Sequence, residues 1–190
     1  RVEFDCDIYI TGSNAKLLSG ELATNLGGRY VEFTIYPFSF QEFTELYKEI
    51  FPGAQPQECF QKYLLFGGMP YLANLRYAEE PCRQYLTDVF NSVQLKDIVK
   101  RNKIRDVDLL ERILSYIIAN VGTTFSATSI SKFFKSEKRN VAPETILNYI
   151  RHCTDAYLFY PVKRQDLQGK QILASSEKYY IADHGVREAV

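Results

Sequence analysis

The chain has 190 residues, of which 46% are hydrophobic and 24% are charged. This composition is typical of a globular protein with a buried core, and it excludes disordered and collagen-like classes. The 23 Lys and Arg residues balance the 23 Asp and Glu residues, so no overall positive field attracts nucleic acid, and binding of that kind would need a local basic patch.

Membrane and metal classes are also disfavoured. No apolar run approaches the ~20 residues that cross a bilayer, and the N-terminus has no signal-peptide pattern, so we expect a cytoplasmic protein without a membrane partner. The four cysteines are scattered and the two histidines lie near no carboxylate cluster, which predicts reduced structural cysteines and no metal site. The chain begins on a strand-like segment and ends in a helix-like one, and we expect it to be a piece of a longer protein.

Two β-strand patterns are predicted near the N-terminus. Residues 8–10 form a continuous apolar run, the pattern of a strand covered on both faces. Residues 30–35 alternate aromatic and β-branched side chains, which predicts a second strand. Between them, Ser13 or Asn14 suits the N-cap of a short helix over residues 15–18.

The next part of the chain is predicted to be helical. Ser39 and Glu42 form a capping box that opens a helix to about Ile50, and a Pro-Gly pair then ends it. The following segments also have helical periodicity, with a break at "GGMP": residues 58–66, residues 71–75, and a longer helix from about Pro81 to about residue 101.

Three helices and a two-stranded ribbon are predicted for the last part. The helices start near residue 108, after Ser126 and at Pro143, and the strands cover residues 157–162 and 178–183 around a turn at 165–170. This order is that of a winged helix-turn-helix. The side chains expected to face inward on the second and third helices are Ile130, Phe133, Phe134, Ile146, Ile150 and Cys153.

Three separated segments together resemble a known family. "ITGSNAKLLSGELATNLGGRYVEFTIYPFSFQEF", "YLLFGGMPYL" and the winged-helix pattern occur in order, and they resemble the second half of prokaryotic P-loop ATPases of the AAA+ superfamily that carry a C-terminal domain of unknown function. The resemblance implies a mainly α chain with a small α/β part. Its implied domains are an ATPase-core remnant (1–50), a helical lid or linker (51–105), a winged helix-turn-helix (106–183) and the start of a further domain (184–190).

The same resemblance implies roles for three groups of residues. Ser13 and Asn14 would sense the γ-phosphate or the attacking water, and Arg29 would stabilise charge on the γ-phosphate within its own subunit or across a subunit boundary. The lid element would approach the adenine through its glycine backbone and a proline face, at Gly68, Met69 and Pro70.

Each group also has a plainer interpretation. Ser13 and Asn14 equally suit helix caps, Arg29 suits a solvated side chain beside a glycine turn, and "GGMP" suits a simple helix break. The chain has no GxxxxGK[ST] motif and no acidic strand end ahead of residue 8. We therefore expect ATP and Mg²⁺ to be held by a Walker A and Walker B half of the parent protein, and this chain alone to bind no cofactor tightly and to hydrolyse no ATP.

Two further interpretations stay open. The first is a DNA-binding regulator whose third winged-helix element reads the major groove, with candidate contacts at Lys135, Lys138, Arg139, Asn148 and Arg151. The second is a protein-interaction module without site chemistry. Acidic neighbours dilute the candidate DNA patch, and residues 96–105 form another basic stretch that suits either nucleic acid or a helix C-terminus. The partners considered are thus the missing ATPase half, another copy of the chain, and DNA.

Overall fold

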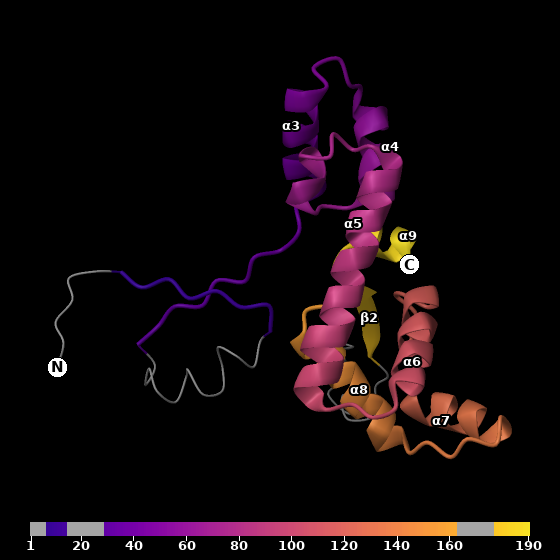
Figure 1. Cartoon of the computed structure of the whole chain (residues 1–190). Helices are drawn as coiled ribbons and strands as arrows, with labels where there is room; N and C mark the ends of the chain where they lie inside the picture. The colour runs from indigo at the N-terminus through magenta and orange to yellow at the C-terminus, as the bar shows by residue number, and fades with distance from the viewer. Residues whose placement is uncertain (1–6, 15–28, 163–176) are drawn as a thin grey trace, which may run out of the picture.

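The computed structural model describes residues 7–14, 29–162 and 177–190, which form a mainly helical protein with one small sheet, as expected (Figure 1). None of the described helices is long and apolar enough to cross a membrane. The elements are α3 (Phe40–Ile50), α4 (Pro56–Phe66), the 3₁₀ turn η1 (Pro70–Ala73), α5 (Glu79–Ser92), the π-helix η2 (Val93–Lys100), α6 (Val107–Ala119), α7 (Ala127–Ser136), α8 (Pro143–Asp155), β1 (Phe159–Val162), β2 (Lys178–Ile181) and α9 (His184–Ala189).

Local capping signals set several helix ends. The Ser39 backbone N–H donates to Glu42 Oε2 over 2.8 Å, and the Glu42 N–H donates to Ser39 Oγ over 3.4 Å, which confirms the predicted capping box. Ser126 Oγ accepts from the Ser129 N–H at the start of α7. Prolines occupy the first turn of α4 and of α8, where their missing N–H costs no helical hydrogen bond.

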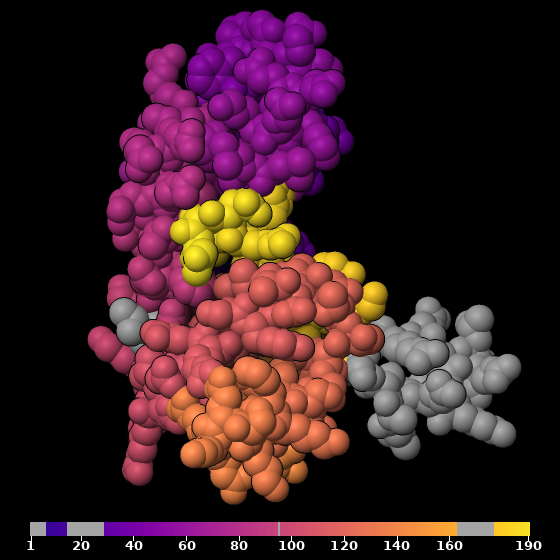
Figure 2. Space-filling model, turned by 90° about the vertical axis from the view of Figure 1, so that its right-hand side faces the viewer, coloured from indigo at the N-terminus to yellow at the C-terminus, as the bar shows by residue number. Residues whose placement is uncertain are grey.

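The longest helical segment is α5 continued by η2, and it connects two parts of the molecule (Figure 1). One part contains α3, α4 and η1, and the other contains α6 to α8 with the sheet. Figure 2 shows α9, in yellow, between these two parts. Because α9 also packs on α4 and α5, the end of the chain is part of this assembly.

Each part has a well-buried core. Aromatic rings dominate the first core, where Phe43 stacks on Tyr47 at 5.5 Å and contacts Tyr63 and Tyr77. Burial of each large apolar side chain contributes about 1.5–3 kcal/mol. Aliphatic side chains fill the second core, and Ile130, Phe134, Ile146, Ile150 and Cys153 are buried as predicted. Three described cysteines are free and buried: Cys59, Cys82 and Cys153.

The sheet consists of β1 and β2 paired antiparallel. Phe159 lies opposite Ile181, and Val162 lies opposite Lys178. Both strands were predicted from their aromatic and β-branched residues, whereas the predicted turn at 165–170 lies outside the described residues.

The two N-terminal strand predictions are wrong. Residues 7–14 and 29–36 have no strand structure, and their apolar side chains are exposed, for example 77% at Ile8, 79% at Phe33 and 88% at Ile35. A strand needs a neighbour to hydrogen-bond its backbone, and no described residue pairs with these segments. The predicted short helix at 15–18 lies outside the described residues.

Phe133 was also predicted to face inward, and that prediction is wrong. Its side chain is 57% exposed, although Ile130 and Phe134 on the same helix are buried. Successive helical residues are rotated by about 100°, so Phe133 falls at the edge of the stripe that packs on the core.

Candidate functional site

The predicted sensor residues lie next to η2. Ser13 Oγ donates to Asp97 Oδ2 over 3.1 Å, and Asp97 Oδ1 lies 3.4 Å from Arg101 Nη2. The Asn14 side chain is buried, with 1% of its surface exposed. Ser13 is thus positioned by a carboxylate of the helical part, and the phosphate-sensing role of Ser13 and Asn14 stays a prediction.

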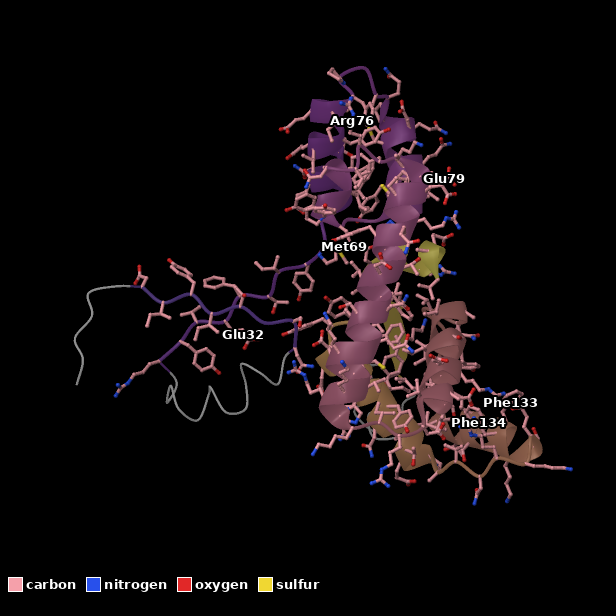
Figure 3. The ribbon with its side chains drawn as sticks, in the orientation of Figure 1. Glu32, Met69, Arg76, Glu79, Phe133 and Phe134 are labelled. Carbon is pink, nitrogen blue, oxygen red and sulfur yellow. The ribbon has the colours of Figure 1, made fainter. Side chains whose placement is uncertain are left out.

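Arg29 lies exposed on an extended N-terminal arm, residues 29–37, that leaves the helical body (Figure 3, where Glu32 lies on the arm). No hydrogen bond or ion pair among the described residues joins Arg29 to Ser13 or to Met69. The structure therefore brings none of the three predicted nucleotide-contacting groups into contact with another.

The "GGMP" element lies at a buried junction centred on Asp183. The Gly68 N–H donates to Asp183 Oδ2 over 2.7 Å, and the Val186 N–H donates to Asp183 Oδ1 over 3.1 Å. The carboxylate thus caps α9 and binds the loop after α4. Gly67 has φ +74°, and an added Cβ would lie 2.1 Å from Asp183 Oδ1, so only glycine fits there.

The same junction holds the N-terminal arm. The Phe38 N–H donates to the Gly68 carbonyl over 2.8 Å, and the Phe38 carbonyl accepts from the Tyr63 hydroxyl over 3.0 Å. His184 Nε2 donates to the Tyr63 carbonyl, and the two rings lie edge to face at 4.5 Å. Burial, followed by the nearby Asp183 and Glu42 carboxylates, raises the pKa of Tyr63, which keeps its hydroxyl protonated as a donor.

This junction changes the interpretation of the predicted adenine contacts. The backbone of Gly68 is occupied on both sides, by Asp183 and by Phe38, and a Cβ at Gly68 would lie 2.2 Å from the Phe38 carbonyl oxygen. Met69 is half-buried and Pro70 is exposed. Of the three predicted residues, Met69 and Pro70 are those with surface left for a ligand.

The predicted DNA-contacting residues lie on α8 and on the loop between α7 and α8. Arg139 binds Asp106 through two hydrogen bonds of 2.6 and 2.7 Å and also pairs with Asp108. The bond from Arg139 lowers the pKa of Asp106. The other members are exposed: Lys135, Lys138, Asn148 and Arg151. Arg139 thus joins α6 to this loop, and DNA contact at the set stays a prediction.

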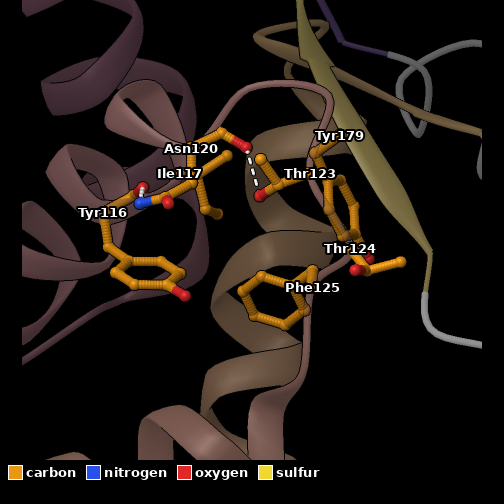
Figure 4. Close-up of a pocket in the computed structure, with 7 residues that line it drawn as sticks. All are labelled: Tyr116, Ile117, Asn120, Thr123, Thr124, Phe125 and Tyr179. Atoms are coloured by element: carbon orange, nitrogen blue, oxygen red, sulfur yellow. Dashed lines mark hydrogen bonds between the residues drawn. The ribbon is translucent and has the colours of Figure 1, made fainter.

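The cavities of the molecule do not converge on these residues. The cavity in Figure 4, between α6 and β2, measures ≈ 10 Å³, which at most holds one water. Asn120 and Thr123 close it with a hydrogen bond of 2.8 Å (Figure 4). Two wider open grooves exist, one of ≈ 760 Å³ beside Phe40 and Phe60 and one of ≈ 590 Å³ beside Phe133. In the described part of the chain, no three His, Cys, Asp or Glu side chains are grouped to hold a metal ion.

Comparison with protein families divides the chain close to the start of α4. Residues 2–44 are similar to the AAA domain family. Residues 57–190 match a domain of unknown function, DUF8612. Because that match covers well over half of the chain, the protein belongs to the DUF8612 family.

Two relatives resemble nearly the whole chain. An uncharacterized protein of Haemophilus influenzae is 39% identical over 188 residues, which cover 98% of this chain and 46% of that protein. An uncharacterized protein of Methanocaldococcus jannaschii is 28% identical over 187 residues, covering 93% of this chain and 41% of that protein. The chain therefore spans less than half the length of these relatives. No solved structure matches it significantly.

The sequence analysis did not identify Asp183, Phe38 and Tyr63. Asp183 precedes a helix and suits an N-cap, so its local role was predictable. Its bond to Gly68 joins residues 115 positions apart, and no local pattern indicates such a partner. The bonds of Phe38 use its backbone, which leaves no signature in the side-chain sequence.

Proposed function

We propose that this chain is the sensor and lid part of an AAA-type ATPase, followed by a winged-helix module. The observation that carries the proposal is the AAA-domain match, which ends at residue 44 inside α3. The AAA-like segment and the helical part therefore share one helix. The Phe38 backbone binds both Gly68 and Tyr63, which supports a tight connection between them.

The exposed arm supports the same proposal. Its apolar side chains, such as those of Val31, Phe33 and Ile35, have the pattern of strands in a covered sheet, yet they face solvent in this chain. In the full-length protein, the Walker A and Walker B half would supply the neighbouring strands together with the sites for ATP and Mg²⁺. On its own the chain is expected to hydrolyse no ATP.

The roles of individual residues follow from this arrangement. Ser13 and Asn14 would approach the γ-phosphate, and Arg29 would neutralise charge that develops there. Met69 and Pro70 would lie on the adenine side. The helices α6 to α8 with the β1–β2 ribbon occur in the order of a winged helix, and we assign them the role of a spacer or lid, since Arg139 is engaged by Asp106 and Asp108.

Substitution in the full-length protein tests the proposal. Arg29→Ala is expected to lower ATP turnover by about 10³-fold or more, with nucleotide affinity nearly unchanged, because an arginine at the γ-phosphate acts in the transition state. Arg83→Ala is the matched control, since Arg83 is an exposed arginine in a surface ion pair with Glu79. Equal turnover in the two variants would assign Arg29 to the surface and reject the proposed site.

A further inference from the structure

The end of the long helix formed by α5 and η2 carries a concentration of positive charge. Residues 96–105 contain five Lys or Arg and a single Asp, whereas the whole chain has a net charge of +0. Arg101 pairs with that acid, Asp97, at 3.4 Å. The other four are exposed and form no ion pair within the described ranges, and we name them the basic ridge: Lys96, Lys100, Lys103 and Arg105.

The backbone beneath the basic ridge is fixed by hydrogen bonds. Lys96 and Lys100 are four positions apart on a helix and therefore share one side. At the helix end, the Ile104 N–H donates to the Val99 carbonyl over 3.0 Å and Asn102 Nδ2 donates to the Ile98 carbonyl over 2.9 Å. Lys103 has φ +51° within this closing turn, a conformation more usual for Gly or Asn.

The helix dipole explains only part of this charge. Cations are favoured in the last turn of a helix, which accounts for Lys100 and its neighbour Arg101. Lys96 lies in an earlier turn, and Lys103 and Arg105 lie beyond the helix end. Elsewhere in the winged-helix part the arginines have acidic partners, as Arg112 does with Glu137.

We propose that the basic ridge binds the phosphate backbone of duplex nucleic acid. Lys and Arg that lack acidic partners can replace the counterions around phosphates without breaking a bond in the protein. Single-stranded nucleic acid is disfavoured because it needs aromatic stacking surfaces. Residues 96–105 contain no aromatic side chain, and Ile98 is fully buried. The proposal goes beyond nucleotide sensing and does not depend on it.

The salt dependence of binding to a mixed-sequence duplex of about 20 base pairs tests this inference, with the 190-residue chain at about 50–200 mM salt. The ridge variant combines Lys96→Gln, Lys100→Gln, Lys103→Asn and Arg105→Gln, with Asn chosen because it tolerates positive φ. Its slope of log K against log salt is expected to flatten by about 3 to 4, because each lost phosphate contact contributes about 0.9.

A matched control removes the same charge from the winged-helix surface. It combines Lys132→Gln, Lys135→Gln, Lys138→Asn and Arg151→Gln, all exposed, and Lys138 has φ +62° as the counterpart of Lys103. The control slope is expected to stay within about one of the wild type. A flattened slope in the control but not in the ridge variant, or no duplex binding by the wild type at about 50 mM salt, overturns the proposal. If the combined variant does not fold, Lys96→Gln and Arg105→Gln, each tested alone, must each flatten the slope by about one.

Discussion

Gly185 illustrates how close the backbone segments come at the Asp183 junction. A Cβ added to Gly185 would lie 2.0 Å from the carbonyl oxygen of Phe66, a distance that no side-chain rotation relieves. The α9 helix can dock on α4 only because this position has no side chain. A steric limit of this kind makes a prediction about a single methyl group.

Gly185→Ala is expected to lower the free energy of unfolding by about 2–4 kcal/mol, since the helix must shift and lose its contacts to α4 and α5. Gly53→Ala is the control, because its Cβ would meet nothing within 4 Å, and its stability should change by less than about 1 kcal/mol. Urea denaturation of both variants provides the measurement. Equal stability would mean that α9 does not dock as described.

A second prediction concerns Asp106 and acid. Its pKa is lowered, chiefly by the hydrogen bond from Arg139, so the stabilising charge is present above the ordinary value of 3.8 and is lost as the pH falls through the lower folded value. Asp106→Asn keeps a cap for α6 but removes the charge. The variant should have a lower Tm than wild type at pH 7, and the difference should shrink below about pH 4. A gap in Tm that is independent of pH would contradict the assignment.

Single residues were predictable where their partners are close in sequence. Ser39 and Ser126 cap helices through bonds that span three positions, and both were predicted. Asp183 serves a distant loop and was missed. Ser13 was expected at the edge of a sheet, yet its hydroxyl binds Asp97, which lies 84 positions away.

At the scale of elements, α8 provides a test of which face supports the fold. Ile146 is fully buried, whereas its neighbour Leu147 is 44% exposed. Ile146→Ala should cost about 2–5 kcal/mol through the cavity that it leaves, and Leu147→Ala should cost less than about 1 kcal/mol. Thermal unfolding of the two variants compares them directly. Similar losses would place both residues in an interface.

Helices could be predicted from the sequence much better than the N-terminal strands. A helix satisfies its own backbone hydrogen bonds, so caps and a 3.6-residue period suffice to locate it, as they did for α3, α7 and α8. A strand depends on a partner elsewhere. β1 has that partner in β2, whereas residues 8–10 and 30–35 have the same β-favouring side chains and no partner among the described residues.

At the scale of the whole molecule, the arm and the helical body should differ in their resistance to protease. Chymotrypsin is expected to cleave the 190-residue chain first at Tyr30, Phe33 or Tyr36, which are exposed on extended backbone. If the arm forms a sheet in the full-length protein, as proposed, cleavage there should slow by at least about tenfold relative to this chain. Mass spectrometry of early fragments identifies the sites. First cleavage within α3 to α8 would contradict the described fold.

The candidate site was the least predictable part of the molecule. The motif "GGMP" correctly indicated a close backbone approach, but the approaching groups are Asp183 and Phe38 of the same chain. Which groups meet depends on the tertiary arrangement of α4, α9 and the arm. The motif alone does not contain that arrangement.

The two hydrogen bonds of Phe38 have a mechanical consequence. Both use main-chain atoms, so evolution can exchange the side chain at position 38 without loosening the connection, with proline as the exception because it lacks the N–H. Tension along the arm would reach Gly68 and Tyr63 before any other group of the helical body. From there Asp183 and His184 pass it to the last helix, so the beginning and the end of the described chain are coupled like two ends of one lever.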